Sequence, residues 1–267
     1  MGSSVSRVIV KLGGGLITDK TEYRHVSMER IDAVSAVIRE LKEAGHSVII
    51  VHGAGSFGHL EARKWSLSGG FNPDISEEQE LAIARVRSDM DDLNKCVIES
   101  LMRAGVESEA LPPREWADGV GVEFKGDLGP FTRGPEEPLP ITFGDVVETT
   151  GPARFGILSG DHIMVRLGCE MADVAACLFL LGDVDGLMDK NPDDGDAVLL
   201  PTWRLEQEFS GSHDKDVDVT GGILLKAHCA ALIAHDVEQV WLLNGTVPSR
   251  MLEIVSDGDA IGTRILI

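Results

Sequence analysis

A glycine-rich loop that directly follows an apolar run constrains the fold of this chain more than any other feature. The apolar run is Ser47–Val51, and the loop Val51–His59 reads VHGAGSFGH. Three glycines and an alanine leave backbone N–H groups free to bind an anion, because no bulky side chain covers them. The pattern predicts a buried strand, a phosphate-binding loop and then the start of a helix.

Apolar runs alternate with helical patterns along all 267 residues. Strands are expected at 7–11, 47–51, 106–111, 141–143, 155–158, 174–181 and 240–243, and residues 264–267 close the chain. Helices are expected at 28–45, 76–104 and 161–169, after Gly222, and from Pro248 at an N1 position, with a capping box at Ser76–Gln79. Residues 112–140 lack periodicity and predict an irregular or hairpin insertion. Continuous apolar strands between helices predict an α/β fold whose mainly parallel sheet is covered on both faces.

A second glycine loop, Gly13–Gly15, follows the first predicted strand and lies between Lys11 and Lys20. It matches neither a Walker A loop nor a Rossmann fingerprint. Taken alone, it fits a turn beside solvated lysines equally well. Two such loops in one domain favour an enzyme that holds two phosphorylated molecules face to face.

Histidines begin and end the first loop. His59 is the better candidate to donate a hydrogen bond to a phosphate, because the chain there turns into a helix whose first turn attracts anions. His52 is expected to support the end of the strand from inside. Asp161 opens another helix, where it can act as an N-cap, orient nearby lysines by charge, or do both.

Two segments of the C-terminal half complete the candidate site. The turn Gly182–Gly186 follows a buried strand, and its spacing does not fit a calcium loop, so a nucleotide-binding turn is the better interpretation. Lys226 lies one helical turn past Gly222 and can point back toward phosphates at the helix N-terminus. A helix cap beside an exposed lysine is the alternative.

The amino-acid composition limits the kinds of molecule that this protein is expected to bind. The chain has 44 acidic and 24 basic residues and a net charge of −20, which disfavours nucleic acid and anionic membranes. Its four cysteines form no C-x-x-C pair, and no residues form a metal-ligand cluster, so a metal site in the protein is not expected. We expect a cytoplasmic protein with small-molecule substrates and no membrane-spanning run.

Taken together, these segments resemble the isopentenyl phosphate kinases of the amino-acid kinase superfamily. The matching segments occur in the family's order: 11–20, 52–59, 143–146, 159–161, 183–186, 218–226 and 243–245. The closing His59 is the most specific of these features. Glycine stands at positions 15 and 182, where the family usually has serine and threonine, and His162 replaces a usual aspartate.

The resemblance implies an open αβα sandwich of one domain, with acceptor binding at about 1–158 and ATP binding at about 159–267. It implies ATP with Mg²⁺, a homodimer, and a place in isoprenoid biosynthesis through a mevalonate pathway. By motif, ATP would contact Lys11, Gly13, Gly14, Gly15, Gly55, Asp183, Gly186, Gly222 and Lys226. The acceptor phosphate would contact Ala54, Gly55, His59 and Gly160. Lys20 would stabilise the transferring phosphoryl group, and Asp161 would organise the lysines.

The implied reaction is in-line attack of isopentenyl phosphate on the γ-phosphorus of ATP. No general base is needed, because a phosphate monoester is already anionic, and the lysines, His59 and the loop amides would offset the repulsion between two polyanions. Two alternatives remain. One is a kinase of the same fold for another acceptor, such as a phosphonate of the fosfomycin type or a carboxylate. The other is a non-catalytic nucleotide- or oxyanion-binding protein.

Overall fold

An eight-stranded sheet forms the centre of the protein. The computed structural model describes residues 6–19, 22–207 and 222–267. The strand order is β10 (Thr202–Trp203), β12 (Thr263–Ile265), β11 (Gln239–Asn244), β9 (Val174–Leu181), β1 (Arg7–Leu12), β2 (Ser47–His52), β6 (Leu139–Phe143) and β3 (Ser108–Ala110). Neighbouring strands from β11 to β3 are parallel, whereas β12 pairs antiparallel with β11 and parallel with β10. The predicted, mainly parallel sheet is confirmed.

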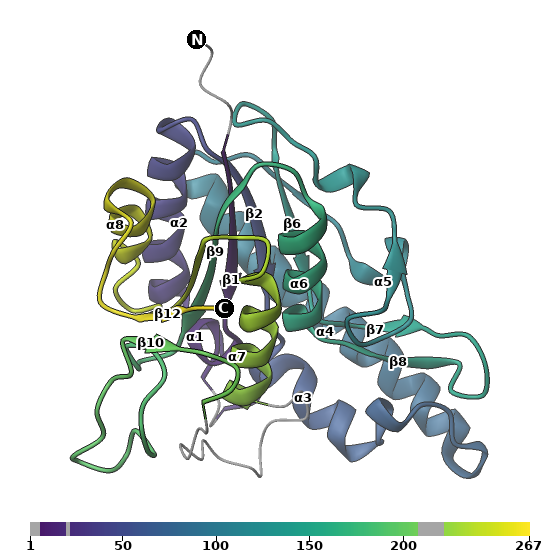
Figure 1. The fold of residues 1–267 in the computed structure, drawn as a ribbon. Helices are drawn as coiled ribbons and strands as arrows, with labels where there is room; N and C mark the ends of the chain where they lie inside the picture. The colour runs from purple at the N-terminus through teal and green to yellow at the C-terminus, as the bar shows by residue number, and fades with distance from the viewer. Residues whose placement is uncertain (1–5, 20–21, 208–221) are drawn as a thin grey trace.

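Helices cover both faces of this sheet (Figure 1). The first face packs against α1 (Gly14–Ile17), α2 (Met28–Glu43), α3 (Gly55–Lys64), α4 (Ser76–Arg103) and α8 (Arg250–Asp257). The second face packs against α6 (Gly160–Glu170) and α7 (Gly222–Ile233). Along β1, Val8 and Val10 point into the first core and Ile9 into the second, as the alternation of a strand requires. The expected αβα sandwich is therefore confirmed.

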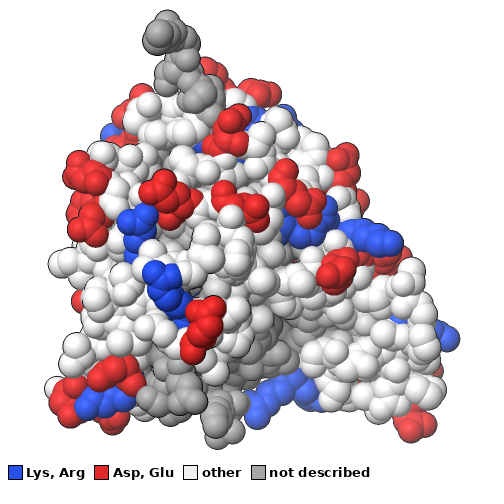
Figure 2. Space-filling model, in the orientation of Figure 1, with Lys and Arg blue, Asp and Glu red and all other residues white. Residues whose placement is uncertain are grey.

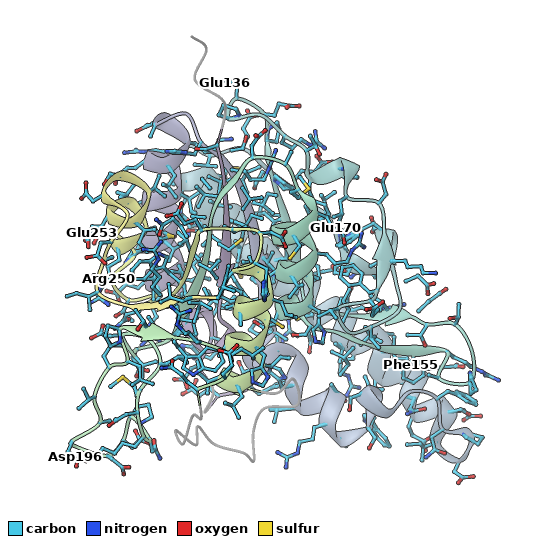
Figure 3. All side chains as sticks on the ribbon, in the orientation of Figure 1. Glu136, Phe155, Glu170, Asp196, Arg250 and Glu253 are labelled. Atoms are coloured by element: carbon cyan, nitrogen blue, oxygen red, sulfur yellow. The ribbon has the colours of Figure 1, made fainter. Side chains whose placement is uncertain are left out.

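Smaller elements lie beside the main sheet. They are α5 (Pro113–Trp116), the hairpin of β4 (Ala117–Asp118) and β5 (Lys125–Gly126), the hairpin of β7 (Asp145–Glu148) and β8 (Phe155–Leu158), and the 3₁₀ turns η1 (Leu67–Gly69), η2 (Pro73–Ile75) and η3 (Gly129–Phe131). The 112–140 insertion thus contains a hairpin, as predicted, and also a short helix. Figure 3 labels Phe155 on β8 and Asp196 at the tip of the connection from β9 to β10.

Two predicted helix starts are wrong in detail. Ser76 is the first residue of α4 and makes no side-chain cap. Its expected capping partner, Gln79, is buried and instead holds the preceding loop, accepting from the amide of Asn72 and donating to two carbonyls in that loop. Helix α8 begins at Arg250, so Pro248 precedes it by two residues and is not at N1.

The carboxyl ends of the parallel strands meet at one edge of the sheet. Strands β1, β2, β6, β9 and β11 are each followed directly by a glycine, namely Gly13, Gly53, Gly144, Gly182 and Gly245. A Cβ atom on Gly13 would lie 2.7 Å from the carbonyl oxygen of Leu180, and one on Gly53 would lie 2.8 Å from the amide of Gly14. Glycine therefore lets the strand exits crowd together at the edge where α/β proteins bind ligands.

The surface mixes charges of both signs. On the face drawn in Figure 2, basic side chains form small groups between acidic ones. Within the described part of the chain, no helix is long and apolar enough to span a bilayer.

Candidate active site

The two glycine loops predicted to bind phosphates pack directly on each other. A Cβ atom on Gly14 would lie 2.4 Å from the amide nitrogen of Gly55, which no real side chain tolerates. Gly55 itself has φ of +49°, in the left-handed region that favours glycine. The loops of β1 and β2 therefore form one surface of backbone, with Ala54 partly exposed at the start of α3.

Thr18, which sequence reasoning missed, fastens these loops together. Its hydroxyl donates to the carbonyl of Gly14 (2.8 Å) and accepts from the amide of Ser56 (3.0 Å). Thr18 is almost fully buried, at 1% exposure. Its position one helical turn after Gly14 was a possible signal, but the contact with Ser56 joins residues 38 positions apart and has no local pattern.

Lys11, Asp161 and Lys226 converge behind the loops. Lys11 Nζ pairs closely with Asp161 Oδ1, and Lys226 Nζ lies 3.6 Å from Asp161 Oδ2. The lysines come from β1 and α7, and the aspartate comes from the first turn of α6. The predicted charge pairing of Asp161 with lysines is thus observed. The alternative N-cap role falls to Ser159, whose hydroxyl accepts from the amide of Asp161.

Burial changes the acid–base chemistry of Lys11. The side chain is 5% exposed, and desolvation lowers its pKa to about 8, although the nearby Asp161 carboxylate acts in the opposite direction. The positive charge of Lys226 is a second, smaller cause of this lowered pKa. An arriving polyanion would stabilise the protonated form of Lys11.

Gly160 lies where this lysine cluster meets the first loop. A Cβ atom on Gly160 would lie 3.2 Å from Val51 Cγ1, 3.4 Å from the carbonyl of His52 and 3.5 Å from Lys11 Cε. Glycine therefore lets the N-terminus of α6 approach the end of β2. This position agrees with the predicted contact of Gly160 with an acceptor phosphate, which stays a prediction.

The two histidines of the loop differ in burial. His52 is fully buried, stacks on Phe143 with ring centroids 4.9 Å apart, and lies 3.2 Å from the side-chain oxygen of Asn94. Desolvation lowers its pKa to about 4, so it stays neutral. His59 is only partly buried and lies in the second turn of α3, because the helix already begins at Gly55. The expectation that His59 stands at the start of this helix is therefore wrong, and its phosphate contact stays a prediction.

The acidic turn after β9 is held by neighbours that the sequence did not indicate. Asp185 accepts from Arg250 (2.6 Å) and from Asn244 (3.1 Å), whereas Asp183 is exposed. Figure 3 labels Arg250 on α8, beside the sheet. A Cβ atom on Gly186 would lie 2.4 Å from Thr263 Oγ1, so packing against β12 already requires glycine there.

The three departures from the expected family pattern lie near this site. A Cβ atom on Gly182 would lie 3.4 Å from the carbonyl oxygen of Gly15, so two of the departures are neighbours. His162 follows Asp161 and is partly buried, and its Nδ1 has no hydrogen-bond partner among the described residues. Desolvation lowers the pKa of His162.

Several predicted site residues cannot be placed. Lys20 and the stretch 218–221 lie outside the described residues. Gly222 is the first residue of α7, and its carbonyl accepts from Lys226 Nζ at 3.3 Å. The roles predicted for Gly13, Gly14, Gly15, Gly55, Asp183, Gly186 and Gly222 toward ATP, and for Ala54 and Gly55 toward the acceptor, stay predictions.

Two packed glycine loops lie beside two lysines that share one carboxylate, at the carboxyl edge of an αβα sandwich. This arrangement is the candidate site for phosphate groups. The model of the amino acid kinase family matches residues 6–244, and the chain belongs to this family.

Curated relatives with the name isopentenyl phosphate kinase match nearly the whole chain. The protein of Thermoplasma acidophilum is 32% identical over 97% of this chain and 99% of its own length. That of Methanothermobacter thermautotrophicus is 27% identical, over 97% and 98% respectively. A crystal structure described as an isopentenyl phosphate kinase substrate complex superposes with a TM-score of 0.79 at 30% identity, covering 97% of this chain and 99% of that one.

The Thr18 hydroxyl gives a test of the loop packing. Replacing Thr18 with Val keeps the shape but leaves the buried amide of Ser56 without its partner, whereas the carbonyl of Gly14 still accepts from the backbone amide of residue 18. We expect a loss of about 1–3 kcal/mol in the free energy of unfolding, measured by urea titration.

Thr142→Val is the matched control, because the buried Thr142 hydroxyl has no hydrogen-bond partner among the described residues. We expect this control to retain the stability of the wild type. Equal stability losses in the two variants would contradict the role of Thr18.

Proposed function

We propose that this protein transfers the γ-phosphoryl group of ATP to isopentenyl phosphate and forms isopentenyl diphosphate. The observation that carries the proposal is the convergence of Lys11, Asp161 and Lys226 beside two glycine loops in contact. Relatives that share about 30% identity over almost the full chain and carry this enzyme's name support the choice of acceptor.

The buried lysines would act on the phosphates of ATP. ATP would supply the transferred phosphoryl group, and the Gly13–Gly15 loop fits such a polyanion because its backbone is not covered by side chains. Lys11 and Lys226 would hold the phosphates, while Asp161 keeps the two ammonium groups in place and offsets their mutual repulsion. This cluster is preorganised, so little rearrangement is needed when charge moves in the transition state.

The acceptor would lie on the α3 side of the loops. His59, Gly160 and the amides of Ala54 and Gly55 would hold its phosphate, and Lys20 would stabilise the phosphoryl group in transfer. The surface between the two loops would bring acceptor and donor phosphates into line, which supplies much of the rate enhancement. We keep the division into an acceptor part, 1–158, and an ATP part, 159–267, as part of this proposal.

Among the described residues, no group of three His, Cys, Asp or Glu side chains is placed so that it could coordinate Mg²⁺. Asp161 is already engaged by two lysines. We therefore propose that Mg²⁺ arrives on the phosphate oxygens of ATP, as it does in many kinases, and we assign it no further step. We also propose a cytoplasmic homodimer that serves isoprenoid biosynthesis through a mevalonate pathway.

The proposal is tested by ADP release from Mg·ATP with isopentenyl phosphate, dimethylallyl phosphate, geranyl phosphate or fosfomycin as acceptor. We expect efficient turnover of isopentenyl phosphate and a raised KM for it in His59→Ala, because a phosphate contact is lost. The matched control is His235→Ala, which removes an exposed histidine in the turn after α7.

If fosfomycin were the acceptor that is turned over and isopentenyl phosphate were not, the proposed acceptor would be wrong, but the proposed kinase activity would stand. ATP binding without turnover of any acceptor would favour a binding protein instead. Unchanged kinetics in His59→Ala would contradict the role of that residue alone.

The lowered pKa of Lys11 makes nucleotide binding dependent on pH. Below about pH 8 the lysine is protonated before ADP binds, whereas above it the neutral lysine must take up a proton to pair with phosphate. Titration calorimetry of ADP in buffers of different ionisation enthalpy should therefore show proton uptake at about pH 8.5 and little at about pH 6.5.

Lys11→Arg should abolish that proton uptake, because arginine stays protonated throughout this range. Absence of proton uptake in the wild type at the higher pH would contradict a neutralised Lys11.

A further inference from the structure

The acidic turn after β9, residues 182–186, is fixed by side chains rather than by its backbone. Within the described part of the chain, none of its amides or carbonyls bonds to another backbone group. The turn nevertheless lies beside the Gly13–Gly15 loop, because a Cβ atom on Gly182 would lie 3.4 Å from the carbonyl oxygen of Gly15. The side chains that fix the turn therefore also fix one wall of the candidate nucleotide site.

Asp185 makes the polar contacts that fasten this turn. Its Oδ1 accepts from Arg250 Nη1 at 2.6 Å and from Asn244 Nδ2 at 3.1 Å. The hydrogen bond from Arg250 lowers the pKa of Asp185, so the carboxylate stays charged at neutral pH. Asn244 is itself held, because its Oδ1 accepts from the amide and the hydroxyl of Thr246. The segment 243–245, to which no role has been assigned so far, thus takes part in fixing the acidic turn.

Arg250 lies where its surroundings give little reason for a positive charge. Its side chain is only 11% exposed, so the guanidinium is largely desolvated. It is in the first turn of α8, where the helix dipole disfavours a cation. Within the described residues, this guanidinium pairs with Asp185 alone. The contact with the acidic turn is therefore the observed interaction that accounts for an arginine at this position.

The other contacts of the turn fix only its end. A Cβ atom on Gly186 would lie 2.4 Å from Thr263 Oγ1, and the same hydroxyl accepts from the amide of Leu187 at 2.8 Å. These contacts hold the end of the turn against β12. Asp183 is exposed, so the middle of the turn depends on Asp185 and its two partners.

We infer that Arg250 is a positioning residue, which holds the acidic turn through Asp185 in the place where the nucleotide binds. The inference rests on the proposed function, because it concerns the ATP side of the same site. It adds a residue of α8 that touches no phosphate and acts through Asp185. The turn would hold the nucleotide and not the group in transfer, so loss of Arg250 should weaken nucleotide binding more than it slows turnover.

The test compares Arg250→Met with Arg264→Met in titration calorimetry of ADP and in steady-state kinetics with isopentenyl phosphate. Methionine keeps an apolar stem but removes the charge. We expect Arg250→Met to raise the Kd for ADP and the KM for ATP about five- to tenfold, because a hydrogen bond to a charged group is lost. The KM for isopentenyl phosphate and kcat should stay within about twofold.

Arg264→Met is the matched control. Arg264 lies on β12 and pairs with Glu238, which is 86% exposed, so its ion pair contributes little. All the constants of this control should stay within about twofold of the wild type.

Two further variants separate positioning from a general loss of stability. Arg250→Lys should recover part of the ADP affinity, because one Nη1 contact with Asp185 can be replaced by an ammonium group. Asp185→Asn changes a side chain that is 44% exposed, and it should weaken ADP binding in the same sense. Combined with Arg250→Met, it should add little further loss, because both changes remove the same interaction.

A wild-type affinity for ADP in Arg250→Met overturns the inference, and so does a fully additive loss in the double variant. ADP binding needs no acceptor, so it decides about Arg250 independently of the substrate. A wild type that binds ADP but does not turn over isopentenyl phosphate would overturn the proposed acceptor alone. A wild type that binds no ADP would overturn the proposed function and this inference together.

Discussion

The buried pair of Lys11 and Asp161 is the interaction on which the proposed site depends. It joins the first strand to the first turn of α6, two segments 150 positions apart, and Lys226 attaches α7 to the same carboxylate. Removing one partner of a buried pair typically costs about 3–5 kcal/mol, because the other charge is left uncompensated. Such a buried cluster contributes little net stability to a fold, because its charges must be desolvated. It does hold two ammonium groups close together, where a polyanion can balance their charge.

The glycines that follow the strands are the second constraint on the site. They matter because there is no room for a side chain, not because glycine is flexible. Gly14 lies so close to Gly55 that a methyl group on either would displace the partner loop. Thr18 closes the same contact with its hydroxyl. The two loops and the lysine cluster therefore form one connected arrangement. A change in any of them should reach the phosphates.

The sequence predicted much of this arrangement because the signals were local. Each of these patterns is visible within about ten residues of sequence: the apolar strand runs, the glycine loops and the helix after Ser159. The carboxyl ends of parallel strands then meet at one edge of the sheet. The pairing of Asp161 with lysines was predicted because Asp161 follows a strand and opens a helix. The details that failed depend on distant partners. The side chain of Gln79 does not form a capping box, because it hydrogen-bonds to the loop before α4 instead. Strand β8 pairs with β7 and is not part of the main sheet. The contact of Thr18 with Ser56 gave no local signal, because the two residues lie 38 positions apart.

The most direct measurement is a crystal structure of the protein with ADP and isopentenyl phosphate bound together. The account predicts the β-phosphate of ADP within hydrogen-bond reach of Lys11 and Lys226. It predicts the isopentenyl phosphate beside His59 and Gly160, with the contact between Gly14 and Gly55 separating the two ligands. A nucleotide phosphate remote from Lys11, or an acceptor phosphate away from the His59 loop, would contradict the account.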